Sequence, residues 1–355
     1  MTVERRRLRI GVAGAGWVAS ERHVPAFRRD PRVEVVSVYD RSLERATRLA
    51  RRARIPHASD HLNDFFAQDL DIVAVCTSPW THASLAIESL QRGCHVLSEK
   101  PMALSSDDAI AMVRAAEAAG RILCLNHNFL FSRSMLRIKS MMERDELGPI
   151  HHIMAIQSSN PNRRLPEWYP RLPGGLFFDE APHMIYLLRY FMGDIKVEHV
   201  RAQIAPPQRS QPLDVIEASL AGNGITASLT MTFVAPVSEW YIVIFGQHRV
   251  LVIDLFRDIL TVMKPDGNHS LREVVESSLR TYGQLLAGFV ATGALYLTNR
   301  ARFGQDELVR RFLDSVAGSG PPPVTPEQAV GVLQTMEAIL VGIPGLAERQ
   351  ALGAR

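Results

Sequence analysis

Long apolar runs, internal repeats and low-complexity segments are all missing from this 355-residue chain. No apolar run reaches the roughly 20 residues that cross a bilayer, so a transmembrane role is not expected. Neither sign of charge is in large excess, because the chain has 40 Lys and Arg residues and 37 Asp and Glu residues. This balance, without a basic patch interleaved with aromatic residues, argues against nucleic-acid binding.

Cysteine is scarce. Cys76, Cys94 and Cys124 are widely spaced and lie inside apolar segments, a pattern unlike a disulfide framework or a zinc site. We expect buried, reduced thiols in a cytoplasmic protein that holds no metal. Arg5-Arg6-Arg7 precedes a glycine turn and not an apolar segment, so a secretory signal is not expected either.

A glycine-rich turn near the N-terminus says most about function. The apolar segment 8–13 runs into Gly14-Ala15-Gly16, and helix-like residues follow at once. Gly14, Gly16 and Ala19 fit the pattern G-x-G-x-x-G/A, in which the first glycine makes a tight turn and the second admits a pyrophosphate. The pyrophosphate then lies at the N-terminus of the following helix. The residues predicted to contact a dinucleotide here are Gly14, Gly16, Trp17 and Val18.

A second apolar run, 33–39, ends in Asp40, whose carboxylate can accept hydrogen bonds from the adenosine ribose hydroxyls. The same carboxylate would repel a 2′-phosphate, which favours NAD over NADP. The next residue, Arg41, starts a helically spaced arginine stripe that continues to Arg52, and we interpret the stripe as a solvated helix face. Alternatively, Arg41 touches the adenosine or pairs with a 2′-phosphate. We therefore expect NAD or NADP, with NAD favoured.

Residues 1–125 alternate strand-like and helix-like segments, which predicts a parallel, doubly wound sheet of the α/β class. Ligands bind such sheets at the edge formed by the carboxyl ends of the strands. The expected strands are 8–13, 33–39, 72–76, 94–98 and 121–125, and the expected helices are 17–28, 42–53, 60–67, 82–92 and 105–119.

In residues 126–355 strand-like and helix-like segments no longer alternate, and these residues are expected to form a second domain of the α+β type. Consecutive strands without intervening helices, between about 197 and 263, predict a large and mostly antiparallel open sheet. Asn223-Gly224 is a hairpin signal between two of them. The helices that follow are too few to cover the apolar face of this sheet, so we expect an interface there and a homo-oligomer.

Two further loops of the first domain are expected at the ligand-binding edge. Thr77 and Ser78 follow a buried strand, and His82 starts the next helix, where it either contacts the cofactor or caps and packs the helix. Glu99-Lys100-Pro101 follows the next strand, and we expect Glu99 and Lys100 to contact the cofactor. Charges placed there are costly unless they are paired or functional, and a lysine near a nicotinamide can bind a substrate hydroxyl. The alternative for Glu99 and Lys100 is a surface ion pair in a turn.

A third group of residues lies in the second domain. Asp179 and His183 are four apart, so on a helix they share one face, and apolar neighbours predict that this helix is largely buried. An acid and an imidazole placed in this way suit proton transfer. The alternative is a structural hydrogen bond inside a core. The loop before them, 160–173, is rich in proline and arginine and either lines the substrate pocket or is solvated.

Together and in this order, these segments resemble the glucose–fructose oxidoreductase, inositol dehydrogenase and rhizopine catabolism family (Gfo/Idh/MocA). The resemblance rests on Gly14-Ala15-Gly16, the loop Pro79 to His82, Glu99-Lys100-Pro101 and Asp179 with His183. It implies an N-terminal Rossmann domain, NAD(P)-dependent redox chemistry on sugars or polyols, and dimers or tetramers that pair their open sheets. It also implies that Lys100 and His183 flank the reacting hydroxyl and that Asp179 orients the substrate.

The chain departs from the family pattern at four places. Pro79-Trp80 replaces the usual Pro-Asn, Ala181 replaces a glycine, Tyr186 replaces an acid, and an arginine is missing around Asn126-His127-Asn128. These changes affect the prediction of the substrate more than the prediction of the cofactor. We expect an oxidoreductase that acts on a sugar, polyol or nucleotide-sugar-like substrate. The alternatives are elimination or glycoside cleavage driven by transient oxidation with bound NAD, and a dinucleotide-sensing regulator without turnover.

Overall fold

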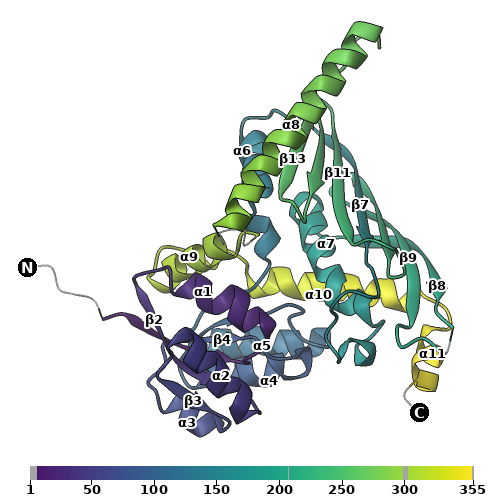
Figure 1. Ribbon diagram of the computed structural model, residues 1–355. Coiled ribbons are helices and arrows are strands. Elements are labelled where there is room, and N and C mark those ends of the chain that lie inside the picture. Colours follow the sequence, from purple (N-terminus) through teal and green to yellow (C-terminus); the bar gives the residue numbers. More distant parts are fainter. Residues whose placement is uncertain (1–5, 207, 299–302, 354–355) are drawn as a thin grey trace, which may run out of the picture. The chain divides into compact units, whose positions relative to one another are not determined.

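The computed structural model describes residues 6–206, 208–298 and 303–353, which form two compact units (Figure 1). Unit 1 comprises Met1–Asn128 with Gly304–Leu333, and unit 2 comprises Phe129–Phe303 with Gln334–Arg355. The sequence places a boundary after residue 125, but residues 304–333, much later in the chain, also pack in unit 1. None of the helices within the described ranges is both long and apolar enough to cross a membrane.

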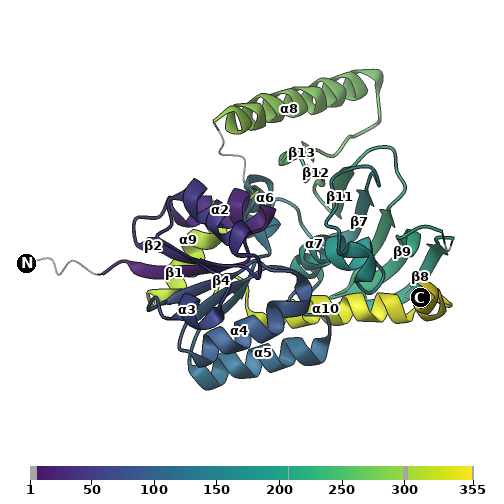
Figure 2. The same cartoon turned by 60° about the horizontal axis from the view of Figure 1, so that its bottom comes forward.

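Unit 1 is built on a six-stranded sheet in the order β3-β2-β1-β4-β5-β6, in which every pair of neighbours is parallel. The predicted doubly wound sheet is therefore confirmed. Its central strands are apolar on both faces because helices cover both faces; Figure 2 shows α2 on one side, and α4 and α5 on the other. The strands are β1 (Leu8–Ala13), β2 (Val33–Tyr39), β3 (His57–Ser59), β4 (Ile72–Val75), β5 (His95–Ser98) and β6 (Leu123–Leu125).

Local sequence explains where the helices of unit 1 begin and end. Ser42 and Ser105 are N-caps whose side chains accept hydrogen bonds from the backbone of α2 and α5, and Gly120 ends α5 with a φ of +59°. The predicted helix 17–28 contains a π-helical turn, Ala19–His23, just before Pro25, which lacks a backbone N–H. The helices are α1 (Val24–Phe27), α2 (Leu43–Ala53), α3 (Leu62–Phe66), α4 (His82–Gln91), α5 (Ser106–Ala119) and α9 (Gln305–Val316).

Unit 2 is built on a seven-stranded sheet in the order β13-β12-β11-β7-β10-β9-β8. It is antiparallel except for the pair β7 and β10, so the predicted open sheet is confirmed. Asn223 and Gly224 both have positive φ and join β9 to β10, as the hairpin signal predicts. The strands are β7 (Ile150–Ser158), β8 (Lys196–Ile204), β9 (Leu213–Gly222), β10 (Ile225–Thr232), β11 (Glu239–Gly246), β12 (Val250–Asp254) and β13 (Ile259–Met263).

The two faces of this sheet differ. One face packs against α7, and alternate residues such as Ile153 and Ala155 are buried there. The other face is partly accessible, and it carries an apolar row on β12, β11 and β7, where Val252, Val243 and Met154 lie in register. The same row continues over β10, β9 and β8 with polar residues.

Helices complete unit 2, and α10 links the two units because it starts in unit 1 and ends in unit 2. The longest helix, α8, contacts β13 at the edge of the sheet, and its first turns extend past the strands in Figure 1. The helices are α6 (Arg133–Glu143), α7 (Leu176–Met192), α8 (Leu271–Leu297), α10 (Pro326–Val341) and α11 (Leu346–Gly353).

Candidate active site

The glycine turn lies where the strand order of unit 1 reverses, between β1 and β4. Gly14 has a φ of +103°, and a Cβ at this position would come within 2.6 Å of the Cys76 carbonyl. Only glycine therefore lets the first turn pack against the end of β4. A Cβ at Gly16, by contrast, would meet nothing within 4 Å. The turn thus leaves open space at the switch point, where doubly wound sheets bind ligands.

Trp17 and Val18 begin the helix that follows the turn. The Trp17 ring is exposed, and the Arg22 guanidinium lies 5.3 Å from its centroid. Val18 is half-buried. Both residues therefore lie at the helix N-terminus, as predicted, while their contact with a dinucleotide stays a prediction.

Asp40 ties the glycine turn to the end of β2. Its Oδ2 accepts a hydrogen bond from the backbone N–H of Ala15 at 2.9 Å, and its Oδ1 accepts from the N–H of Ser42 and from the Arg45 guanidinium. Burial raises the pKa of Asp40, but Arg45 and the two N–H groups outweigh burial and lower that pKa below its usual value. Among the residues that the structure describes, Oδ2 accepts one hydrogen bond, which leaves room for a second donor such as a ribose hydroxyl. The neighbouring Arg41 is exposed.

The loop after β4 is fixed by a buried histidine. His82 Nδ1 lies 2.8 Å from the Pro101 carbonyl oxygen, and its Nε2 lies 3.1 Å from that of Thr77. Burial lowers the pKa of His82, so the ring is neutral and donates only one of these hydrogen bonds at a time. The Thr77 hydroxyl accepts from Thr81, and Ser78 is half-buried. His82 therefore joins the loops after β4 and β5, which is the packing alternative, and its contact with a cofactor stays a prediction.

Glu99 forms a buried network that the sequence does not reveal. Its Oε1 lies 2.7 Å from His23 Nε2 and accepts a hydrogen bond of 2.6 Å from Asn126 Nδ2. Burial lowers the pKa of His23, but Cys76 and the Glu99 carboxylate raise it to about 10. Burial raises the pKa of Glu99, but His23 and Lys100 bring it below its usual value. At neutral pH Glu99 and His23 form a buried ion pair, so a surface ion pair in a turn is not the explanation of Glu99.

Lys100 follows Glu99 at the carboxyl end of β5, two strands from β1. Its side chain is half-buried, and its backbone N–H donates to Glu99 Oε2 at 3.2 Å. The peptide bond to Pro101 is cis. Lys100 therefore lies on the same edge of the sheet as the glycine turn, as predicted.

The third predicted group lies on α7 in unit 2. This helix begins after Gly175, ends at Gly193 and contains Pro182 in its interior. From Leu176 to Leu188 every residue is buried except Asp179 and His183, which are half-buried. The shared helix face predicted for Asp179 and His183 is therefore the one face of this stretch that solvent can reach.

An aromatic cage surrounds the His183 imidazole. Its centroid lies 5.1 to 5.6 Å from the rings of Phe129, Trp240 and Tyr186. His183 Nδ1 lies 2.9 Å from the Tyr186 hydroxyl, which accepts a hydrogen bond from the Phe129 N–H. The tyrosine that departs from the family pattern therefore fixes the orientation of the histidine.

A second buried group on α7 is not predicted from the sequence either. Glu180 is buried, accepts hydrogen bonds from Gln157 and from Ser159, and pairs with Arg163. Burial lowers the pKa of Arg163, and the nearby Asp179 carboxylate opposes that shift. The loop 160–173 is thereby attached to the helix that carries Asp179 and His183. The only hint in the sequence is the arginine content of the loop.

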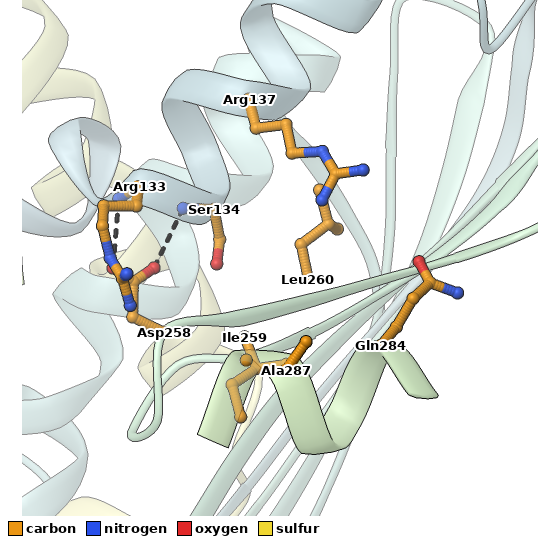
Figure 3. A pocket seen from close by; sticks show the side chains of 9 residues that line it. Arg133, Ser134, Arg137, Asp258, Ile259, Leu260, Gln284 and Ala287 are labelled. Atoms are coloured by element: carbon orange, nitrogen blue, oxygen red, sulfur yellow. Dashed lines mark hydrogen bonds and ion pairs between the residues drawn. The ribbon is translucent and has the colours of Figure 1, made fainter. Parts of the chain in front are cut away.

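A cavity of about 240 Å³ lies elsewhere in unit 2 (Figure 3). Residues of α6, β13 and α8 line it, among them Arg133, which pairs with Asp258. Figure 3 shows Arg133 and Arg137 on α6 and Gln284 on the facing α8. None of the predicted site residues lines this cavity.

Comparison with known proteins bears on both units. Residues 8–127 match the model of an oxidoreductase family with an NAD-binding Rossmann fold, and residues 135–252 match the GFO/IDH/MocA C-terminal domain. A dTDP-3,4-didehydro-2,6-dideoxy-α-D-glucose 3-reductase of Streptomyces violaceoruber is 25% identical over 74% of this chain and 79% of the relative. A myo-inositol 2-dehydrogenase of Thermotoga maritima is 29% identical over 55% of this chain and 58% of the relative.

The fold is also similar to solved structures. The WlbA dehydrogenase from Bordetella pertussis, in complex with NADH and UDP-GlcNAcA, superposes with a TM-score of 0.77 over 95% of this chain and 96% of that one, at 22% identity.

Proposed function

The chain belongs to the Gfo/Idh/MocA family of NAD-binding oxidoreductases, and on that premise we propose that it moves hydride to or from a carbinol carbon of a sugar, polyol or nucleotide-sugar-like substrate. The observation that carries the proposal is the position of Lys100 on the same sheet edge as the glycine turn. A lysine at this edge lies on the side of the sheet where a dinucleotide binds.

The residues at the switch point fit a dinucleotide. Gly16 leaves space for the pyrophosphate at a helix N-terminus, and Asp40 Oδ2 keeps one acceptor site for a ribose hydroxyl. Trp17, Val18, Thr77 and Ser78 complete the proposed binding surface. NAD is favoured because the Asp40 carboxylate would repel a 2′-phosphate. When bound, NAD supplies the hydride acceptor at nicotinamide C4.

His183 is the proposed general base. In the tautomer that we assign, Nδ1–H donates to the Tyr186 oxygen, so Nε2 is the ring nitrogen that carries the lone pair. Nε2 accepts the hydroxyl proton as the carbinol carbon becomes a carbonyl, and returns it in the reverse direction. Lys100 hydrogen-bonds to the same hydroxyl, and Asp179 orients the substrate.

Relatives indicate the substrate class. The two curated relatives are named for a dideoxy-sugar nucleotide and for inositol, and the Bordetella enzyme is in complex with a UDP-sugar acid. Each of these has a six-membered ring that carries secondary hydroxyls or ring carbonyls, the two forms that hydride transfer interconverts. We propose the same class for this chain.

We also propose that the protein is a cytoplasmic homodimer or homotetramer. All three cysteines are free and buried, which suits a reducing compartment. The apolar row Val252, Val243 and Met154 on the accessible sheet face suits pairing with a second copy.

A substrate screen tests the proposal. Sugars, polyols and nucleotide-linked sugars are each incubated with NAD or NADP, and the absorbance of the reduced nicotinamide is followed. Turnover of one ring class, lost in His183→Ala, supports hydride transfer. Tight dinucleotide binding with no turnover across the panel contradicts it and favours a sensing role.

A further inference from the structure

Helix α8 carries an exposed apolar seam that the proposed chemistry does not use. Residues spaced alternately by four and three positions follow one stripe of the helix, as in a coiled coil. They are Val275, Leu279, Tyr282, Leu286, Phe289, Gly293 and Tyr296. The six with side chains are between 49% and 70% exposed.

From Val275 to Gly293 the seam lies opposite the face with which α8 packs on its own unit. Tyr296, at its end, lies nearer that face, since its hydroxyl donates to the Phe256 carbonyl at 3.4 Å. Gln284 exchanges hydrogen bonds with the Val262 backbone, a Cβ on Gly288 would meet Ile259 at 2.7 Å, and the buried Thr292 hydroxyl donates to the Arg257 carbonyl. These three residues are four apart and share one face. Leu286 is two residues from Gln284 and from Gly288, hence about 200° around the helix from each.

The exposed area is large for a single helix. Tyr282, Phe289 and Tyr296 are 70%, 63% and 53% exposed, so these three rings leave on the order of 350 Å² of surface in water. Leu279, Leu286 and Val275 add to this, as do the flanking Val290 and Leu297. The total is comparable with the roughly 800 Å² that each partner buries in a standard protein interface.

The distribution of charge on α8 indicates which part is covered. Arg272, Glu273, Glu276 and Arg280 lie in its first ten residues, and Thr281 to Leu297 contain no charged residue. A partner for this uncharged part is therefore apolar, and a second copy of α8 provides such a surface.

Side-chain sizes fit an antiparallel pair. When two α8 seams run in opposite directions, Leu286 lies against Phe289 of the other copy, Leu279 against Tyr296, and Tyr282 against Gly293. A Cβ at Gly293 would meet nothing within 4 Å, so the large Tyr282 ring has space there. A parallel pair would instead set Gly293 against Gly293 and leave a void.

We propose that α8 pairs with α8 of a second copy of this chain, antiparallel across a two-fold axis, along the seam from Leu279 to Tyr296. The arrangement buries the uncharged part of both helices and leaves the charged first turns outside the contact. It is separate from the accessible sheet face, so the two interfaces together would build a tetramer.

The mass of the full-length protein in solution tests the pairing. Light scattering at micromolar concentration should show that Leu286→Lys halves the mass, whereas the matched control Ala291→Lys leaves it unchanged. Ala291 is exposed and lies five residues from Leu286, about 140° around the helix and outside the seam. An unchanged mass in Leu286→Lys, or an equal loss in the control, overturns the proposal. So does a wild-type monomer that binds lipid vesicles through the seam.

Cross-linking tests the direction. In the antiparallel pair Leu279 faces Tyr296, and the two copies of Leu279 are 17 residues apart along the axis, about 25 Å. A short bismaleimide should therefore join a mixture of Leu279→Cys and Tyr296→Cys proteins but neither variant alone. The three native cysteines are buried and do not compete. Linkage within either single variant contradicts the antiparallel arrangement.

Discussion

His183 depends on a tyrosine for its orientation, because the Tyr186 hydroxyl contacts Nδ1 and also accepts the Phe129 N–H. Tyr186→Phe should lower kcat by up to about 10²-fold, since a small displacement of a catalytic group has effects of that size. NAD affinity should stay unchanged. Steady-state kinetics with calorimetric titration of NAD checks this, and Tyr190→Phe, an exposed tyrosine on the same helix, is the control. A Tyr186→Phe enzyme with the parent kcat would remove Tyr186 from the positioning of the base.

Asp40 is expected to set the cofactor preference. Wild-type protein should bind NAD at least as tightly as NADP, and Asp40→Ala should weaken this preference because it removes the carboxylate that repels a 2′-phosphate. The structure adds a second effect: the variant also loses the acceptor of the Ala15 N–H, so affinity for both dinucleotides should fall. Calorimetric titration with NAD and with NADP measures these affinities. Arg41→Ala, which should lower only the affinity for NADP, is the control. A clear NADP preference in the wild type contradicts the account.

Residue types and spacing predict which residues face the site. They do not predict the buried residues that hold those side chains in place. Asp179 and His183 share the accessible face of α7 because a separation of four fixes a helix face. His23 and Asn126 approach Glu99 from 76 and 27 positions away, and no local pattern links such distant residues. The pairing of Glu180 with Arg163 depends equally on tertiary structure.

At the scale of elements, the buried pair of His23 and Glu99 connects the π-helical turn after the glycine motif to the end of β5. Because the pKa of His23 is raised from 6.5 to about 10 on folding, the folded protein holds one more proton than the unfolded chain between these values. This stabilisation is complete below pH 6.5 and is lost as the pH rises through 10.

The Glu99→Gln variant tests this dependence. Thermal or urea unfolding from pH 7 to pH 10 should show the wild type losing more stability than Glu99→Gln, whose His23 lacks a carboxylate partner. The exposed pair of Arg48 and Glu44 offers a control, Glu44→Gln, which should follow the wild type. Parallel curves for wild type and Glu99→Gln would show that the ion pair does not contribute.

Most elements are predictable because their signals are local. The helices expected at 42–53 and 105–119 and the Asn223-Gly224 hairpin lie close to where the sequence predicts them, and Ser42, Ser105 and Gly120 mark the ends of these helices. The strand β3 is not predicted, because three residues with an exposed His57 show no alternation. The parallel pairing of β7 with β10 is not predicted either, since it joins strands that are distant in the chain.

At the scale of the whole molecule, two surfaces are expected to build the assembly. Val243→Lys on the accessible sheet face should halve the mass, and combined with Leu286→Lys it should give a monomer. Ser228→Lys, in the same cross-strand row on the polar part of the sheet, is the control. Sedimentation velocity on the wild type, Val243→Lys, the double variant and Ser228→Lys distinguishes the two interfaces. A Val243→Lys protein of wild-type mass contradicts pairing through the sheet.

The central claim is that Lys100 and His183 act in proton transfer during NAD-dependent oxidation of a ring hydroxyl. The direct measurement is kcat of Lys100→Ala and His183→Ala on the substrate found in the screen, with NAD affinity and thermal midpoint measured on the same preparations. Each variant should lose about 10²–10⁴-fold in kcat while NAD affinity and midpoint stay near the wild-type values. A well-folded His183→Ala protein that turns over at the wild-type rate would contradict the account.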